Sequence, residues 1–211
     1  MKRIFWNVDT QYDFMRNDDS FTGALPVENA REIENNLELL TKFAEEKGIQ
    51  VINTGDWHTL ESEEISDEPD YVTKFPAHCL IGTKGAEYVP STDPKKPYVI
   101  DWRNGKFDEN KLRTHRNIVL YKDAFDIFKG SPYSQRVLEI VRPNIAVVYG
   151  VATNVCVDYA VNGLLKRGVD VYVPTDAIKE LPNLPLEKVL SDWKNRGAKL
   201  TTTQKILEDE I

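Results

Sequence analysis

The stretch Asn144–Gly168, NIAVVYGVATNVCVDYAVNGLLKRG, contains the alternation that decides the fold. Its first part, residues 144–152, is a short and mostly apolar run, which is typical of a strand buried on both faces. Its second part, residues 154–168, has a helical pattern of apolar residues and ends at Gly168, a common residue at helix ends. A doubly buried strand followed by a helix favours a parallel sheet covered by helices.

The same alternation of strands and helices continues along the whole chain. Further strands are expected at residues 3–9, 49–56, 117–122, 169–176 and 199–207, and further helices at residues 29–48, 131–143 and 184–198. This pattern predicts a doubly wound, Rossmann-like α/β fold. We expect a three-layer sandwich, in which helices cover both faces of a mainly parallel sheet of about six strands.

The sequence has no internal repeat and no obvious linker, so residues 1–211 are expected to form a single domain. One segment departs from the alternation of strands and helices. Residues 57–116 are rich in Pro, Gly, Asp and Ser and are too long for a plain loop. Long excursions of this kind are usually functional in compact domains, which makes this segment a candidate part of a binding site.

The composition excludes several classes of partner. The 211 residues include 41% hydrophobic and 29% charged residues, an ordinary globular composition. The formal net charge of −7 argues against nucleic acid and anionic membranes as main partners, because both favour basic surfaces. No apolar stretch reaches the length of a membrane span, and no signal-peptide pattern is present. Two cysteines do not make a disulfide framework, so a reducing compartment, the cytoplasm, is expected.

Residues with chemical potential follow the ends of four predicted strands. Asp9 ends the first strand, Asp56 ends the second, Lys122 ends the third, and Cys156 follows the fourth. Ligands of open α/β sheets bind outside the carboxyl ends of the strands, so these side chains are expected at one edge. Each alone has an ordinary structural explanation, since buried cysteine is common filler and the polar residues can cap or face solvent.

Together, three of these residues fit nucleophilic catalysis. A cysteine attacks a carbonyl as its thiolate, and Asp9 is placed to take and return the proton. A nearby Lys122 ammonium and the first turn of a helix are both expected to lower the pKa of the Cys156 thiol. Backbone N–H groups in that turn are candidates for holding the oxyanion of a tetrahedral intermediate.

A metal site is the second hypothesis. Asp56 and His58 lie in the sequence GDWHT, just past a strand, and His78 of FPAHC offers a third ligand. Carboxylate and imidazole ligands with positions left open fit Zn²⁺, Fe²⁺ or Mn²⁺. The spacing alone is a weak signal, and a polar pair that caps a loop is the alternative interpretation.

These residues occur in segments that resemble the isochorismatase-like cysteine hydrolases, and within them the nicotinamidases. The resemblance covers nearly the whole chain and follows the order of the family motifs. Five segments carry it: NVDTQYDF (7–14), TGDWH (54–58), FPAHCLIGTKGAE (75–87), LYKDAFDIF (120–128) and YGVATNVCV (149–157).

The resemblance implies roles for individual residues. The catalytic residues would be Asp9, Lys122 and Cys156, and the ligands of one divalent metal ion per chain would be Asp56, His58 and His78. The family usually has a cis peptide at the position of Val151–Ala152. The backbone N–H groups of Ala152 and Cys156 would then hold the oxyanion, and Gly150 would be small because the turn passes next to the substrate.

Two departures from the family pattern concern the metal and the pocket. Where many nicotinamidases have a further histidine, this chain has Glu64, which makes Glu64 a candidate fourth metal ligand. Phe75 stands where the family often has Trp, so Phe75 and Phe14 are the expected walls of the substrate pocket.

The resemblance implies that the chain is a metal-dependent cysteine amidohydrolase. The expected reaction converts nicotinamide to nicotinate and ammonia through a thioacyl-enzyme, in NAD salvage and pyridine nucleotide biosynthesis, with Zn²⁺ favoured over Fe²⁺ or Mn²⁺. Alternatives are a sibling that hydrolyses another small amide, a carbamoyl compound or a vinyl ether, and a non-catalytic family member. A homo-oligomer is left open. A nucleotide-binding protein is disfavoured because no Gly-x-Gly-x-x-Gly turn follows the first strand.

Overall fold

A computed structural model describes residues 1–182 and 185–210 of the chain. Its centre is a parallel sheet with the strand order β10-β8-β7-β1-β4-β6-β5, and β9 also pairs with β7. Its strands are β1 (Arg3–Val8), β4 (Gln50–Asp56), β5 (Tyr98–Ile100), β6 (Asn117–Lys122), β7 (Ile145–Val151), β8 (Asp170–Pro174), β9 (Ile178–Lys179) and β10 (Lys199–Thr201). A small antiparallel pair joins β2 (Asn17–Asp18) and β3 (Phe21–Thr22).

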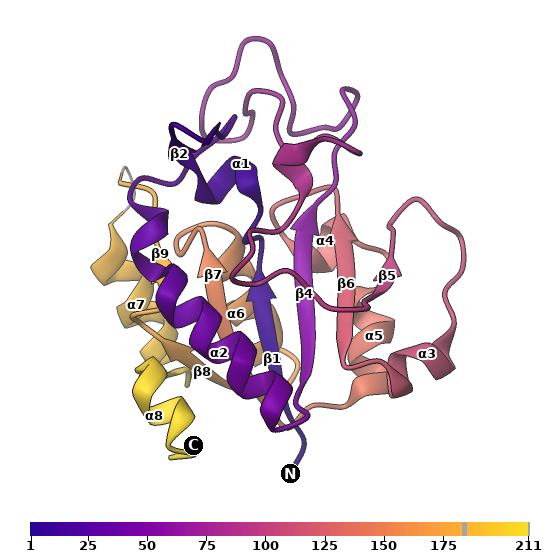
Figure 1. Cartoon of the computed structure of the whole chain (residues 1–211), viewed down its shortest axis with the longest axis vertical. Helices are drawn as coiled ribbons and strands as arrows, with labels where there is room; N and C mark the ends of the chain where they lie inside the picture. The colour runs from indigo at the N-terminus through magenta and orange to yellow at the C-terminus, as the bar shows by residue number, and fades with distance from the viewer. Residues whose placement is uncertain (183–184, 211) are drawn as a thin grey trace.

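Helices cover both faces of this sheet (Figure 1). The α-helices are α1 (Tyr12–Met15), α2 (Glu34–Glu46), α3 (Glu109–Thr114), α4 (Ile127–Gly130), α5 (Ser134–Val141), α6 (Cys156–Leu165), α7 (Leu186–Asn195) and α8 (Thr203–Leu207). Two 3₁₀ turns, η1 (Ala30–Ile33) and η2 (Lys84–Ala86), complete the set. The prediction of a mainly parallel sheet between helical layers is confirmed.

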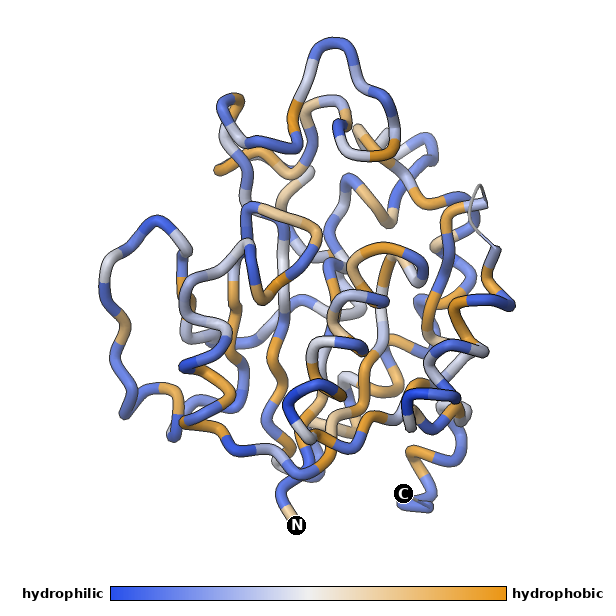
Figure 2. Tube along the Cα trace, turned by 180° about the vertical axis from the view of Figure 1, so that it is seen from behind, coloured by the Kyte–Doolittle hydropathy of each residue, from blue (hydrophilic) through white to orange (hydrophobic). Residues whose placement is uncertain are grey.

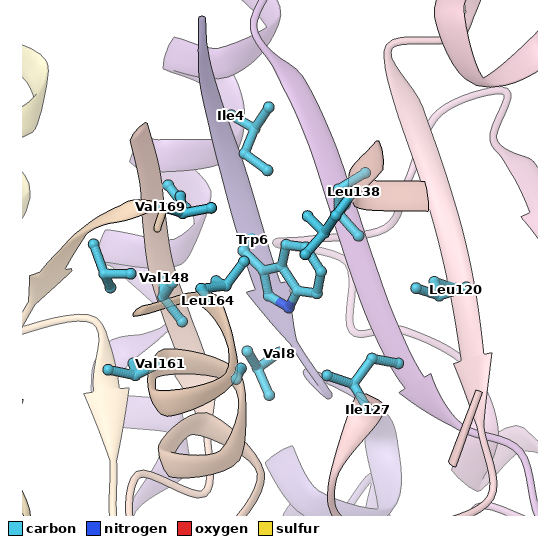
Figure 3. Close-up of a cluster of buried hydrophobic side chains, with 14 of the residues drawn as sticks. Ile4, Trp6, Val8, Leu120, Ile127, Leu138, Val148, Val161, Leu164 and Val169 are labelled. Carbon is cyan, nitrogen blue, oxygen red and sulfur yellow. The ribbon is translucent and has the colours of Figure 1, made fainter. Parts of the chain in front are cut away.

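Strand β1 contributes side chains to two hydrophobic cores, one on each face of the sheet. Its side chains are buried in alternation on opposite faces of the sheet, as a two-residue period requires. Ile4, Trp6 and Val8 join the cluster under α5, α6 and α7, while Phe5 joins the cluster under α2 and α8. Figure 3 shows the first cluster around the Trp6 indole. Burial on both faces explains why most central strands are largely apolar, and Figure 2 shows hydrophobic segments inside the fold, among hydrophilic ones.

Two details of the sheet differ from the sequence prediction. The described residues give eight strands rather than about six, because the short strands β5 and β9 add to the predicted ones. The expected strand at residues 199–207 is correct only for its first part, since α8 begins at Thr203. Thr202 causes the change, because its side chain accepts a hydrogen bond from the Lys205 N–H and caps the helix. The expected helix at 184–198 begins at Leu184, which lies outside the described residues, and α7 confirms most of the remainder.

Both termini lie at the lower end of the sheet in Figure 1, and the carboxyl ends of β1 and β4 lie at the upper end, together with the loop that follows β4. The predicted excursion at residues 57–116 includes β5, η2 and α3. In the part of the chain that the structure describes, no helix combines the length and apolarity needed to cross a membrane.

Candidate active site

Asp9 lies at the carboxyl end of β1 in a turn that fixes its carboxylate. Its φ angle of 50° falls in the left-handed region, which aspartate tolerates better than most residues. Its backbone N–H donates to the Thr54 carbonyl at 3.2 Å, and the Thr54 hydroxyl donates to Asp9 Oδ1 at 2.7 Å. The second carboxylate oxygen, Oδ2, is 3.0 Å from the Lys122 ammonium.

Lys122 ends β6 and is fully buried, which is rare for lysine unless its charge is compensated. Its Nζ forms ion pairs with both Asp9 and Asp56 and lies 3.6 Å from Cys156 Sγ. Burial alone lowers the pKa of Lys122, but the two carboxylates raise it well above its ordinary value. The structure thus brings the three candidate catalytic residues together at one edge of the sheet, with Lys122 positively charged.

Cys156 begins helix α6 and is buried beside this cluster. Burial raises the pKa of its thiol well above the ordinary value, and Asp9 adds to that rise, although Lys122 opposes it. The expected lowering by the lysine and the helix terminus is therefore outweighed by burial, and the resting side chain is a thiol. Burial also raises the pKa of Asp9, against the opposing charge of Lys122, which makes the carboxylate a stronger base than an ordinary aspartate.

The turn before Cys156 contains the cis peptide bond that the resemblance implies, between Val151 and Ala152. The Cys156 N–H belongs to the first turn of α6, where backbone N–H groups have no acceptor within the helix. The structure gives a reason of its own for a glycine at position 150. Its φ of 119° suits glycine alone, and a Cβ there would collide with the carbonyl oxygen of Val8 on the neighbouring strand.

Asp56, His58 and His78 form a buried cluster in which one possible ligand atom from each residue lies within 4.8 Å of the others. The Nε2 atoms of His58 and His78 lie 3.7 and 3.8 Å from Asp56 Oδ2. Their Nδ1 atoms contact the Asp123 carboxylate and the Pro76 carbonyl, both at 2.8 Å. Each imidazole thus directs its Nε2 toward the carboxylate.

This donor set fits a divalent metal ion. His58 Nε2 is buried and has no hydrogen-bond partner among the described residues, a costly arrangement unless a further group binds there. Two imidazole nitrogens and one carboxylate oxygen, with positions left open, are typical of Zn²⁺ and similar ions.

Glu64 lies beside this cluster but does not belong to it. Its Oε1 accepts a hydrogen bond from the Phe125 N–H at 2.6 Å, and its Oε2 is buried without a partner among the described residues. Burial raises the pKa of Glu64 to about 6.

Gln11 and Asp13 are two further residues of the first motif. They form hydrogen bonds with the backbone beside the candidate metal ligands. The Gln11 amide exchanges hydrogen bonds with the N–H and the carbonyl of Asp56, both at 2.7 Å. The Asp13 carboxylate accepts from the N–H of Cys79, next to His78, at 2.6 Å. The sequence interpretation assigned roles only to Asp9 and Phe14 in this motif, although the quoted segment also contains Gln11 and Asp13.

A narrow pocket lies next to the cluster, with about 400 Å³ of space free of protein atoms when open solvent is included. Phe14 and Phe75 line it as expected, and their rings lie 5.4 and 6.4 Å from that of His78. Phe125 also lines it and packs edge-on against Phe75 at 5.4 Å. The sequence interpretation missed several other lining residues. Leu25, Val27 and Leu181 come from loops outside the motifs, whereas Val155 lies within the YGVATNVCV segment. The lining is completed by Asp56, His78, Val151, Ala152 and Cys156.

Comparisons with known proteins agree with this fold. The family model of the isochorismatase domain matches residues 102–205. The nicotinamidase/pyrazinamidase of Mycobacterium tuberculosis is 27% identical over 158 residues, which cover 67% of this chain and 76% of that protein.

Two solved structures show the same fold. The pyrazinamidase of Pyrococcus horikoshii in complex with zinc has a TM-score of 0.75 at 25% identity, covering 96% of this chain and 99% of that one. N-carbamoylsarcosine amidase from Thermoplasma acidophilum has a TM-score of 0.71 at 18% identity, covering 96% and 97%.

The fold thus matches that of the isochorismatase-like hydrolases, and the resemblance that the motifs carry is confirmed. Nicotinamidases and pyrazinamidases are relatives that both the sequence and the structural comparison return.

Proposed function

We propose that this protein is a metal-dependent cysteine amidohydrolase that converts nicotinamide to nicotinate and ammonia. The observation that carries the proposal is the shared pocket, which is lined by Cys156 of the catalytic cluster together with Asp56 and His78 of the metal cluster. A small aromatic amide can therefore contact both groups at once. The nicotinamidase relatives support the substrate class.

The reaction begins with proton transfer from Cys156 to Asp9. The thiolate then attacks the carboxamide carbon, and the Lys122 ammonium, 3.6 Å from the sulfur, stabilises the negative charge. The backbone N–H groups of Ala152 and Cys156 are the proposed donors to the oxyanion.

The second half returns the proton. Asp9 protonates the departing nitrogen, ammonia leaves, and the acyl group stays on the sulfur as a thioester. Asp9 then accepts a proton from water as the water attacks the thioester, and it passes this proton to the Cys156 sulfur as the acyl group leaves. The released acid ionises to nicotinate in solvent. Asp9 thus alternates between acting as a base and as an acid, which its raised pKa favours.

Asp56, His58 and His78 are the proposed ligands of one metal ion per chain, with Zn²⁺ the first choice and Fe²⁺ or Mn²⁺ the alternatives. When bound, the ion supplies a Lewis-acidic position for the pyridine nitrogen. Glu64 is proposed as a fourth ligand, either direct or through water. Phe14 and Phe75 hold the ring, and with it the amide, in place beside Cys156.

The proposal treats residues 1–211 as one catalytic domain that acts in the cytoplasm in NAD salvage, without nucleic acid or membrane partners. A substrate panel tests it, with purified protein offered nicotinamide, a small carbamoyl compound and a vinyl ether. We expect equimolar nicotinate and ammonia from nicotinamide as the fastest reaction. Faster turnover of the carbamoyl compound or the vinyl ether would show that nicotinamide is not the preferred substrate.

A further inference from the structure

Asp123 directly follows Lys122 at the end of β6, and its carboxylate contacts a metal-cluster histidine. Asp123 Oδ1 lies 2.8 Å from His58 Nδ1. The His58 side chain is fully buried, whereas the Asp123 side chain is 21% exposed and keeps part of its hydration. An ionised carboxylate accepts hydrogen bonds only, so Nδ1 is the donor in this pair.

Ser62 anchors the same carboxylate oxygen. Its hydroxyl donates to Asp123 Oδ1 at 2.5 Å, and the N–H of Thr59 donates to the Ser62 oxygen at 2.9 Å. Thr59 is the neighbour of His58 in the chain, so the loop that carries the histidine also holds its carboxylate partner. The three side chains form one chain of hydrogen bonds, in the order Ser62, Asp123, His58.

This arrangement decides which nitrogen of His58 is free. With the proton on Nδ1, Nε2 carries a lone pair, and Nε2 is the atom that lies 3.7 Å from Asp56 Oδ2. Carboxylate–histidine pairs of this kind fix the tautomer and ring orientation of metal ligands in proteins. His78 has a backbone carbonyl, that of Pro76, in the same role, so Asp123 is the side-chain member of the arrangement.

The carboxylate is not needed to shape its own loop. The Asp123 backbone N–H donates to the carbonyl of Gly130, the last residue of α4, at 3.0 Å, which ties the start of the loop to the end of that helix independently of the side chain. The Lys122 carbonyl accepts from the N–H of Trp57 at 3.0 Å, which joins the loop to β4.

We propose that Asp123, anchored by Ser62, is a positioning residue that orients His58 for metal binding. This inference rests on the proposed metal site. Lys122 at the end of β6 is a proposed catalytic residue, and Asp123, the next residue, would then set the affinity of the metal site for its ion.

The test is the Zn²⁺ affinity of purified protein, measured by competition with a chromophoric chelator at a fixed neutral pH. Removing an outer partner of a metal-bound histidine typically weakens binding roughly 10- to 100-fold, and we expect that loss for Asp123→Ala. Asp123→Asn keeps an acceptor and should lose less, and Ser62→Ala should shift the affinity in the same direction. The matched control is Asp126→Asn, three positions along the same loop, where the side chain caps α4 instead.

Two further readouts separate positioning from a structural role. The metal-free variants should unfold at the same temperature as the metal-free parent. The visible spectrum of the Co²⁺-loaded Asp123→Ala protein should differ from that of the parent, because His58 is reoriented. If Asp123→Ala does not fold, the Zn²⁺ affinities of Asp123→Asn and Ser62→Ala are compared with that of the parent instead.

Unchanged Zn²⁺ affinity in Asp123→Ala, with a parent that binds Zn²⁺ tightly, would overturn this inference and leave the proposed metal site standing. A parent that binds no Zn²⁺ would overturn both.

Discussion

Lys122 Nζ lies 3.6 Å from Cys156 Sγ, although the two residues are 34 positions apart in the chain. Strand β6 supplies the lysine and helix α6 the cysteine, and the parallel sheet brings both to one edge. The same ammonium contacts Asp9 and Asp56, so one buried cation links the candidate catalytic residues to the candidate metal ligands. The predictions below follow from that arrangement.

Replacing Cys156 by Ala should abolish turnover, because no other group in the pocket can form the thioester. We expect the rate of ammonia release to fall by at least about 10³-fold. The Zn²⁺ content, measured on the same protein, should match that of the parent, because Cys156 is not among the proposed ligands. The control is Cys79→Ala, which removes the other cysteine and should keep activity; amidase activity retained in Cys156→Ala would contradict the account.

The Cys156 thiol should react slowly with alkylating reagents at neutral pH. Burial raises its pKa, so the thiolate fraction is small near neutrality and grows as the pH rises. The alkylation rate, followed by mass spectrometry in a Cys79→Ala background, should rise with a midpoint above about 8.5, the value of an unperturbed cysteine. A midpoint below that value would show that Lys122 and the helix terminus outweigh burial.

Lys122→Met should destabilise the metal-free protein. The substitution leaves Asp9 and Asp56 buried without their common cation, and breaking a buried ion pair in this way costs about 3–5 kcal/mol. Urea denaturation measures the loss. Lys129→Met is the control, since Lys129 is exposed on α4 and should change stability by less than about 0.5 kcal/mol. Equal stability of the two variants would refute the buried ion-pair network.

Gly150→Ala should lower the free energy of unfolding by about 2 kcal/mol or more, because alanine is strained at this positive φ and its Cβ would meet the Val8 backbone. Gly105→Ala is the matched control, because a Cβ there meets no atom within 4 Å. Thermal unfolding of both variants gives the comparison. A Gly150→Ala protein as stable as the control would show that the strands have room to separate.

Much of this fold could be predicted because its strands are buried on both faces. The largely apolar runs of β1, β6, β7 and β8 are strong local signals, and the rule for the edge of a parallel sheet then places Asp9, Lys122 and Cys156 together. β5 and β9 were missed because runs of three and two residues carry no period. The end of the chain was misassigned because threonine-rich sequence favours strands, whereas here Thr202 caps a helix.

The contacts around the candidate site could not be predicted from the sequence as well as the fold could. Ser62 and Asp123 are 61 positions apart in two irregular loops, and no spacing rule relates them. The direction of the Cys156 pKa shift depends on how completely the pocket excludes water, which is a property of tertiary packing. Motifs indicated the candidate reacting groups, and packing determines their contacts and the directions of their pKa shifts.

Ammonia release from nicotinamide by the purified protein, before and after chelation and again after Zn²⁺ is restored, tests the central claim most directly. The account predicts turnover in the parent, loss on chelation, recovery with Zn²⁺, and no turnover under any condition in Cys156→Ala. Full activity after the metal has been removed, or turnover by Cys156→Ala, would contradict a metal-dependent cysteine amidohydrolase.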